Sequence, residues 1–176
     1  MRIISGSHKG RSIVPPRNFH ARPTTDFAKE NLFNILNNTV NITEAEVLDL
    51  FAGTGSISFE FASRGAKLID SVELHNVHHT FIRQTTLKFG FEQIRAIKAN
   101  ALKFISICSS KYNIIFADPP YEMAAIDKLP DIIFTHNLLK ENGLLIIEHS
   151  NKYEFCSHSR FYGNRRYGSV NFTFFK

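Results

Sequence analysis

Cysteine, methionine and tryptophan are scarce in this 176-residue sequence, which contains two Cys, two Met and no Trp. Cys108 and Cys156 are far apart in the sequence and form none of the closely spaced pairs that bind structural metals. We therefore expect free thiols in a reducing compartment rather than a disulfide. The sequence also lacks the run of about 20 apolar residues that a membrane helix needs, and residues 1–11 lack the apolar core of a secretory signal. These absences predict a soluble, cytoplasmic protein with no membrane partner.

Hydrophobic residues, in contrast, make up 43% of the chain and include 17 Phe. This content suffices for a substantial core and excludes global disorder. At roughly 150 residues per domain, the length allows one domain plus a short appendage. We expect residues 1–24 to form the appendage and residues 25–176 to form the main domain.

Acidic residues are missing from residues 1–22, which carry five basic residues. From His149 to the C-terminus, five further basic residues face only Glu154, so this end is also strongly positive. Because the whole chain has a net charge of +5, its middle is mildly acidic. Two basic ends that meet in space would form the positive surface typical of a nucleic-acid-binding protein. Two separately solvated basic ends are the alternative.

The chain begins with two short apolar stretches on either side of a Gly-containing turn within residues 1–24. This pattern predicts a basic β-hairpin. A polar cap at Thr25 then starts a helix with an apolar stripe, and the helix ends at the breaker pair Asn37-Asn38.

Short apolar runs alternate with helical stretches from Glu46 onward, which is typical of repeated βα units. The expected strands cover residues 47–51, 68–74, 94–99, 113–117 and 144–148. The expected helices follow Gly55 and cover residues 77–89, 101–108 and 123–139. Such apolar strands favour a parallel sheet that is buried on both faces. The segment SVNFTFF alternates with period two and predicts an antiparallel C-terminal hairpin, so the fold class is α/β, with a doubly wound, mostly parallel seven-stranded sheet.

Ligands of doubly wound sheets bind at the carboxyl ends of the strands, near the point where the strand order reverses. The first strand runs into DLFAGTG, residues 49–55. Gly53 and Gly55 permit a tight turn and let backbone N–H groups approach a ligand at a helix N-terminus. Ser58 occupies the third position, where a dinucleotide fingerprint usually has Gly or Ala. A glycine turn without a ligand is the alternative.

Glu73 ends the second strand about 20 residues after Gly53, the usual interval for an acid that binds ribose. A carboxylate at this place can accept hydrogen bonds from both ribose hydroxyls. A solvated acid at a strand end is the alternative. The two features together indicate an adenosine-containing cofactor and leave nicotinamide dinucleotide and S-adenosylmethionine open.

The fourth strand is followed by Asp118-Pro119-Pro120-Tyr121. Two prolines hold the backbone extended and lack N–H donors, so carbonyl groups near Asp118 and Pro119 can form a row of acceptors. The exocyclic amine of a nucleobase is a double donor, and hydrogen bonds from both N–H groups favour the geometry in which its nitrogen attacks a methyl group. Tyr121 can stack on the base and hold it in line with the methyl donor. Two prolines that merely end a strand are the alternative.

Together with the opening segments RIISGSHKGR and RPTTDFAKENLFNIL, the motifs DLFAGTG, Glu73 and DPPY resemble the RsmD family of small-subunit ribosomal RNA (guanine-N2)-methyltransferases. The similarity covers nearly the whole chain. It implies a Rossmann-like methyltransferase domain that transfers a methyl group from S-adenosylmethionine to a guanine of 16S ribosomal RNA, either as free RNA or in the small ribosomal subunit. The catalytic residues implied by the resemblance are Asp118, Pro119, Pro120 and Tyr121. The cofactor-binding residues that it implies are Asp49, Phe51, Gly53, Gly55 and Glu73.

The sequence departs from the family pattern at Asn100-Ala101, where the family resembles Asp-Ala and the acid receives the adenine amino group. Asn100 can still accept this group through its carbonyl oxygen, but the hydrogen bond is neutral rather than charge-assisted. We therefore expect Asn100 and Ala101 to bind the cofactor with reduced affinity.

Residues 1–24 contain the remaining candidates for ligand binding. Arg22 and Thr24 could bind a phosphate or cover the cofactor, and an ordinary turn before a helix cap is the alternative. Lys9, Arg11 and Arg17 are the candidate contacts to the RNA backbone, with a solvated basic hairpin as the alternative.

Three histidines, His75, His78 and His79, superficially resemble a metal cluster. His78 and His79 would point apart on a helix, and no Cys or acid completes a tetrahedral set. We expect no metal ion, and we expect the protein to be a monomer.

Three other functions are open at this stage. Methylation of adenine N6 in DNA uses the same DPPY chemistry, although the N-terminal segments and the lack of a large target-recognition domain argue against it. A nicotinamide-dependent oxidoreductase would need a substrate domain for which the chain has little room. A non-catalytic RNA-binding module on a methyltransferase fold is favoured only by Asn100.

Overall fold

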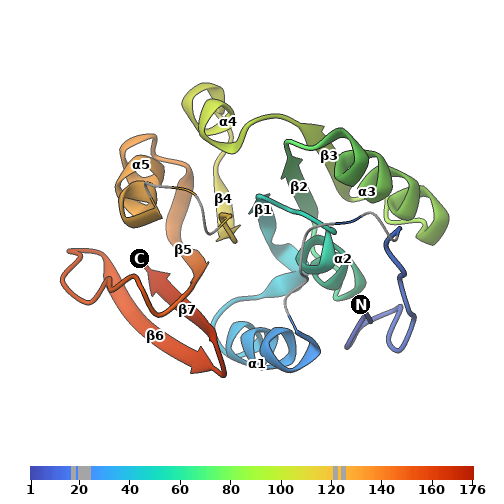
Figure 1. Ribbon diagram of the computed structural model, residues 1–176, viewed down its shortest axis with the longest axis horizontal. Coiled ribbons are helices and arrows are strands. Elements are labelled where there is room, and N and C mark those ends of the chain that lie inside the picture. The colour runs from blue at the N-terminus through green and yellow to red at the C-terminus, as the bar shows by residue number, and fades with distance from the viewer. Residues whose placement is uncertain (17–18, 20–24, 121–122, 124–125) are drawn as a thin grey trace.

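The computed structural model describes residues 1–16, 19, 25–120, 123 and 126–176 (Figure 1). The predicted site residues Arg17, Arg22, Thr24 and Tyr121 lie outside the described residues. The strands are β1 Glu46–Leu50, β2 Leu68–Glu73, β3 Ile94–Lys98, β4 Tyr112–Ala117, β5 Leu139–His149, β6 Phe161–Tyr167 and β7 Val170–Phe175. The helices are α1 Asp26–Asn37, α2 Ser56–Ser63, α3 Asn76–Phe89, α4 Ala101–Ile107 and α5 Leu129–Thr135, with short 3-10 helices η1 Ile42–Glu44 and η2 Ile126–Lys128.

The strands form one seven-stranded sheet in the order β3-β2-β1-β4-β5-β7-β6. Strands β1 to β5 run parallel, whereas β7 pairs antiparallel with both β5 and β6. The chain moves outward from β1 to β3 and then crosses back to form β4 on the other side of β1. The strand order therefore reverses between β1 and β4, where ligands bind in this architecture. The expected doubly wound α/β fold with an antiparallel C-terminal edge is confirmed.

Helices cover both faces of the sheet (Figure 1). Alternate residues of a strand point to opposite faces. Val47 accordingly packs in a buried cluster with α1, α2 and α3, and its neighbour Leu48 packs in a second cluster with α4 and α5. This arrangement explains why the strands are apolar at successive positions. In the part of the chain that the structure describes, no helix combines the length and apolar character needed to cross a membrane.

Local sequence signals explain where the first and third helices begin or end. The Thr25 side chain accepts a hydrogen bond of 3.2 Å from the Ala28 N–H and caps α1, which ends at Asn37 as expected. Helix α3 ends at Gly90, whose φ of +67° is the left-handed conformation that glycine adopts at a helix C-terminus.

The expected helix over residues 123–139 is wrong in extent. Among the described residues of this range, helical structure is limited to η2 and α5, and β5 begins at Leu139 rather than at residue 144. Pro130 lies in the first turn of α5, where its missing N–H is tolerated, and Asn137 leaves the helical conformation with a φ of +53°. Apolar residues continue from this helix into the strand, so hydrophobic periodicity does not mark the boundary.

The N-terminal segment forms the expected antiparallel hairpin. In its described residues the pairing is an isolated antiparallel β-bridge between Arg2 and Ser12 rather than two full strands. Backbone hydrogen bonds of 3.0 Å join the Ile3 N–H to the Arg11 carbonyl and the Ile13 N–H to the Met1 carbonyl. Ile3 and Ile13 are buried in the same cluster as α1 and α2. The division of the chain at residue 24 stays a prediction, but this hairpin shares the core of the main domain.

Glu60 of α2 fixes the hairpin to the body from a fully buried position. Its carboxylate accepts hydrogen bonds from the Ile4 N–H at 2.9 Å and the Ser5 N–H at 3.0 Å. It also pairs with buried Lys29 at 3.5 Å and with Arg64 at 2.9 Å. Burial lowers the pKa of Lys29, and the Glu60 charge opposes this shift. The hairpin, α1 and α2 therefore meet at one buried carboxylate.

Candidate active site

The loop after β1 turns sharply through three residues with positive φ: Phe51 at +61°, Gly53 at +55° and Gly55 at +74°. A Cβ atom on Gly55 would lie 2.9 Å from the Phe59 ring and 3.0 Å from Ile82, so a side chain has no room there. Phe51 adopts the left-handed conformation without being glycine, which is strained and typical of functional sites. Sequence reasoning gave no signal for this strain, because a phenylalanine is not expected at positive φ.

Asp49 lies in β1 below this loop and is only 1% exposed. Its Oδ2 accepts hydrogen bonds from the Ser58 N–H at 3.1 Å and the Ser58 hydroxyl at 2.5 Å. Burial raises the pKa of Asp49 to about 7, the Ser58 hydrogen bonds oppose the shift, and the nearby charge of Glu73 adds to it. The Ser58 hydroxyl also lies 2.9 Å from the Ser71 hydroxyl, from which it can accept while it donates to Asp49. The serine at the third motif position therefore holds the buried acid in place.

Glu73 at the end of β2 is buried and closes the loop from the other side. Its Oε2 accepts from the Gly53 N–H and its Oε1 accepts from the His75 N–H, both at 2.7 Å. Each carboxylate oxygen has two lone pairs, so both can still accept from a ribose diol. The spacing of about 20 residues suggested only the ribose role. The structure adds a positioning role, because Glu73 fixes the glycine loop against β2.

Asp118 follows β4, directly beside the end of β1, because Leu50 pairs with Ala117 in the parallel register. The residue is half-buried. Burial raises its pKa well above the ordinary value, and the nearby carboxylates of Glu148 and Asp49 raise it further. Asp118 is thus one of three carboxyl groups that approach one another at this edge of the sheet, a concentration that favours a cationic ligand.

Pro119 and Pro120 directly follow Asp118, and we call residues 118–120 the catalytic corner. Pro119 is buried and Pro120 is exposed. The Pro120 carbonyl accepts a hydrogen bond of 2.9 Å from the Met123 N–H. The predicted stacking residue Tyr121 lies outside the described residues, so its role stays a prediction.

Asn100 caps α4 at the carboxyl end of β3. Its Oδ1 accepts a hydrogen bond of 3.1 Å from the Lys103 N–H, and Ala101 is the buried first residue of the helix. The Ala99 N–H donates to the Glu73 carbonyl at 3.2 Å, which joins this turn to the end of β2. An N-cap function accounts for an Asx residue here without a ligand. The side chain is exposed and keeps a second lone pair for an adenine amine.

The basic residues of the hairpin lie away from this edge. The Ser7 N–H donates to the carbonyl of Ser63 at the C-terminal end of α2, and Arg11 lies over the Phe89 ring at the C-terminal end of α3. Both helices begin at the carboxyl edge of the sheet, so their C-terminal ends lie at the opposite edge. The structure therefore does not bring exposed Lys9 and Arg11 together with Asp118.

The described basic residues of the two chain ends lie apart. Figure 1 places the N-terminal hairpin, which carries Arg2, Lys9 and Arg11, beside α2 and α3, and it places β6 and β7 at the other end of the sheet. Arg17 and Arg22 lie outside the described residues, so this separation holds only for the described part of the N-terminal end.

Of the three histidines after β2, His75 and His78 are neighbours with ring centroids 5.3 Å apart, and the Nδ1 of His78 lies 3.7 Å from Glu73. His79 points away from them and contacts the Ala96 carbonyl at 3.3 Å. Among the described residues, no group of three or more His, Cys, Asp or Glu side chains is arranged to hold a metal ion.

The chain is similar to a known family of proteins over its whole length. The family model described as Conserved hypothetical protein 95 matches residues 1–176. Ribosomal RNA small subunit methyltransferase D of Escherichia coli is 36% identical over 150 residues, which are 84% of this chain and 71% of that protein. The family resemblance stated from the motifs is confirmed.

Solved structures share the fold. A hypothetical protein of Thermus thermophilus has a TM-score of 0.88 at 22% identity and covers 100% of this chain and 99% of its own. A precorrin-6y C5,15-methyltransferase of Geobacter metallireducens has a TM-score of 0.69 at 14% identity and covers 92% of this chain and 91% of its own. The sheet order and these similarities together identify a Rossmann-like methyltransferase fold.

Proposed function

Because this chain belongs to the Conserved hypothetical protein 95 family over its whole length, we propose that it methylates the exocyclic N2 amine of a guanine in 16S ribosomal RNA. Relatives named ribosomal RNA small subunit methyltransferase D support an S-adenosylmethionine-dependent methyltransferase that acts on ribosomal RNA. The choice of guanine N2 rests on the amine-binding motif at Asp118 together with the N-terminal segments.

One observation carries the proposal. The ends of β1 and β4 are adjacent in the sheet, so the glycine loop and Asp118 lie side by side. A cofactor in the loop and an amine at Asp118 would therefore be neighbours, and holding two reactants together in this way removes much of the entropic barrier to transfer.

The residues present fit S-adenosylmethionine. The loop after β1 turns tightly through positive φ at Phe51, Gly53 and Gly55, which places it over the carboxyl edge. The N–H groups of Gly53 and Gly55 donate to Glu73 and to the Ala52 carbonyl, so the expected N–H contacts to the ligand are not formed by these two glycines. The cofactor supplies an electrophilic methyl group on a sulfonium cation, whose charge suits an edge that holds the carboxyl groups of Asp49 and Glu148 beside the amine-binding Asp118. In this assignment Glu73 binds the ribose and Asn100 accepts from the adenine.

Asp118 orients the target amine. As a carboxylate it accepts a hydrogen bond from the amine, and the proline corner adds carbonyl acceptors from the adjacent backbone. Once the amine has received the methyl group, its nitrogen would have one proton to release, and Asp118 or water would take that proton. The elevated pKa of Asp118 makes its carboxylate a better proton acceptor than an exposed aspartate.

Guanine N2 lies in the minor groove and is paired in a duplex. The target must therefore be in an unpaired segment or be turned out of its stack before it reaches Asp118. This requirement applies equally to free RNA and to an assembled small subunit.

Asp118→Ala tests the proposal. We expect methyl transfer to 16S ribosomal RNA to fall by about 100-fold or more, because the amine loses its acceptor at the transition state. S-adenosylmethionine binding, measured by calorimetry, should remain close to that of the wild type. Asp127→Ala, which removes an exposed carboxylate from η2, is the matched control and should keep full activity.

Equal loss of transfer and cofactor binding in Asp118→Ala would contradict the assigned role. Absence of transfer by the wild type to RNA and to the small subunit would favour a non-catalytic RNA-binding module. Methyl transfer to adenine N6 in DNA would instead favour the alternative of a DNA methyltransferase, because the DPPY motif can also bind that amine.

A further inference from the structure

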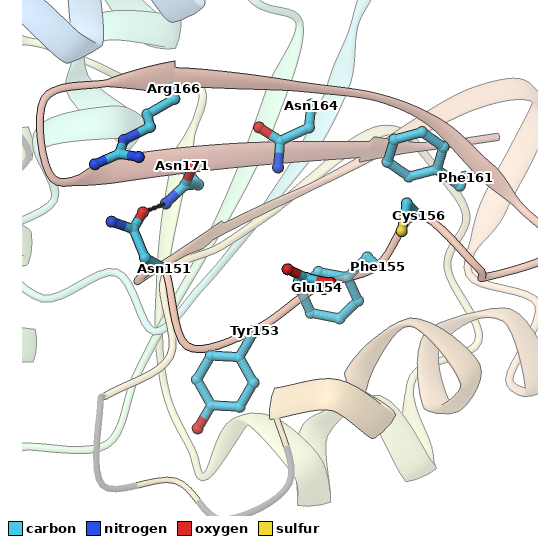
Figure 2. A pocket seen from close by; sticks show the side chains of 9 residues that line it. All are labelled: Asn151, Tyr153, Glu154, Phe155, Cys156, Phe161, Asn164, Arg166 and Asn171. Atoms are coloured by element: carbon cyan, nitrogen blue, oxygen red, sulfur yellow. Dashed lines mark hydrogen bonds between the residues drawn. The ribbon is translucent and has the colours of Figure 1, made fainter.

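A pocket of about 400 Å³ lies beside the catalytic edge, between the chain that follows β5 and one face of the β6–β7 hairpin (Figure 2). We call it the hairpin pocket, and it is lined by residues of 151–156 and of the two hairpin strands. Its volume lies within the range of pockets that bind small organic ligands. None of the roles assigned above uses it.

A β-bulge gives the pocket its aromatic wall. Asn164 and Arg166 face the pocket as alternate residues of β6, so regular alternation would turn Phe161 to the opposite face. The register shifts between Phe161 and Gly163, and Phe161 therefore faces the same side as the other two. Figure 2 shows these three side chains extending from β6 toward the facing loop. Phe161 keeps 36% exposure, so its ring is available to a ligand.

The opposite wall is held in place by hydrogen bonds and ring packing. The Asn171 amide donates to Asn151 at 2.7 Å, shown as a dashed line in Figure 2, and to the His149 carbonyl at 3.3 Å. Buried Phe155 packs edge-on against Phe175 with the ring centroids 5.5 Å apart. These contacts fix the loop to β7, so the pocket is a built feature and not a chance gap between mobile segments.

The groups that face the pocket match the parts of a nucleotide. Arg166 donates through Nε to the Gly168 carbonyl at 3.0 Å, and its two terminal nitrogens can bind a phosphate. An exposed aromatic ring such as Phe161 can stack on a base. Asn and Glu side chains such as Asn164 and Glu154 can pair with polar base edges. The segment from His149 to the C-terminus is strongly positive, which also favours a phosphate.

The distance to the catalytic corner suits a nucleotide next to the target. Ala117, just before Asp118, pairs with Ile147 of β5, and His149 of β5 pairs with Asn171 of β7. The pocket therefore begins two strand spacings, about 10 Å, from the catalytic strand. Both lie at the edge where β4 and β5 end.

We propose that the hairpin pocket binds a short unpaired RNA segment adjacent to the methylated guanine, with one base stacked on Phe161 and a phosphate further along the segment on Arg166. This inference rests on the proposed function and names the part of the substrate that the hairpin recognises. Binding there would hold the strand open beside Asp118, as the unpaired target requires.

Arg166→Ala and Arg165→Ala are a matched pair for the test. They remove the same charge from adjacent exposed residues of β6, but Arg165 lines the other face of the hairpin. We expect Arg166→Ala to weaken binding of a short unpaired oligoribonucleotide about 5- to 10-fold and to reduce the slope of log affinity against log salt by about 1. Arg165→Ala should leave both quantities within about 2-fold of the wild type.

Phe161→Ala should weaken binding by about 5- to 10-fold without changing the salt slope, and Phe161→Tyr should restore it, because stacking needs a ring and not a charge. The S-adenosylmethionine affinity of each variant should equal that of the wild type. This measurement is the control that each variant keeps a folded core. Equal effects of Arg166→Ala and Arg165→Ala, or no effect of Phe161→Ala, would overturn the pocket assignment.

The two proposals fail separately. If the wild type methylates ribosomal RNA and the pocket variants bind and react normally, the proposal of RNA binding in the hairpin pocket is wrong and the proposed methylation of ribosomal RNA is supported. If the variants lose oligoribonucleotide binding as expected while the wild type methylates no RNA, RNA binding in the hairpin pocket is supported and the proposed methylation of ribosomal RNA is contradicted. If the wild type binds no oligoribonucleotide, the pocket proposal is overturned.

Discussion

At the residue scale, the carboxyl groups of the site have different structural roles. Glu73 fixes the glycine loop through the Gly53 N–H, and Asp49 is buried under that loop with Ser58 as its donor. The sequence motifs predicted that these residues gather at the strand ends, because parallel strands bring their carboxyl ends to one edge. They could not predict the strained Phe51 or the bond between Ser58 and Asp49, since both depend on the folded path of the loop.

Asp49→Asn should change how stability depends on pH. The raised pKa of Asp49, about 7 against an ordinary 3.8, means that the folded protein keeps a proton that the unfolded chain releases near pH 4. This group therefore makes folding less favourable as the pH rises from about 4 to about 7, with no further loss above that range. Asn remains neutral and its carbonyl oxygen can still accept from Ser58.

The melting temperature of Asp49→Asn relative to wild type should therefore increase between pH 4 and pH 7 and then level off. Differential scanning calorimetry across this range measures it, with Asp127→Asn as an exposed control that should show no such trend. A constant difference between Asp49→Asn and the wild type at every pH would contradict the raised pKa.

At the element scale, the sequence predicted most strands and helices correctly because each follows a clear signal. The cap at Thr25 and the glycine at Gly90 mark helix ends, and short apolar runs mark the parallel strands. The region 123–139 was misjudged because apolar residues serve both α5 and the start of β5 there. The bulge that turns Phe161 toward the hairpin pocket also has no signal in the sequence pattern.

Glu60→Gln should loosen the junction of the N-terminal hairpin, α1 and α2. The substituted amide would place an N–H donor beside the donors of Ile4, Ser5 and Arg64. It would also remove the carboxylate that pairs with buried Lys29 and leave only the weaker effect of Asp26. Breaking a buried ion pair in this way costs about 3–5 kcal/mol. We expect that loss in urea unfolding, together with faster hydrogen exchange at the Ile4 and Ser5 amides.

Glu44→Gln in η1 is the control for this change, because the residue is exposed. It should alter the free energy of unfolding by no more than about 0.5 kcal/mol. If Glu60→Gln is as stable as Glu44→Gln, the buried carboxylate does not hold the hairpin to the body.

At the scale of the whole molecule, the described basic residues of the two chain ends are separated. The N-terminal hairpin lies beside α2 and α3, the β6–β7 hairpin lies at the other end of the sheet, and β4 lies between them (Figure 1). Counting charges along the chain could not reveal this separation, because it depends on how the hairpin packs against α2 and α3. An RNA that contacts both basic regions must extend across the molecule.

Lys9→Ala tests the contribution of the N-terminal region to RNA binding. If Lys9 neutralises one phosphate, its loss should reduce the slope of log affinity against log salt by about 1. Lys111→Ala removes the same charge from another exposed position and should leave the slope unchanged. Identical slopes for Lys9→Ala and the wild type would exclude a phosphate contact at Lys9.

The central claim is that the corner at Asp118 presents a guanine amine of ribosomal RNA to S-adenosylmethionine. The most direct measurement is mass-spectrometric analysis of nucleosides from 16S ribosomal RNA after incubation with the protein and isotopically labelled S-adenosylmethionine. The account predicts that the label enters N2-methylguanosine and that Asp118→Ala abolishes it. Label in a different nucleoside, or none in free RNA and assembled small subunits alike, would contradict the account.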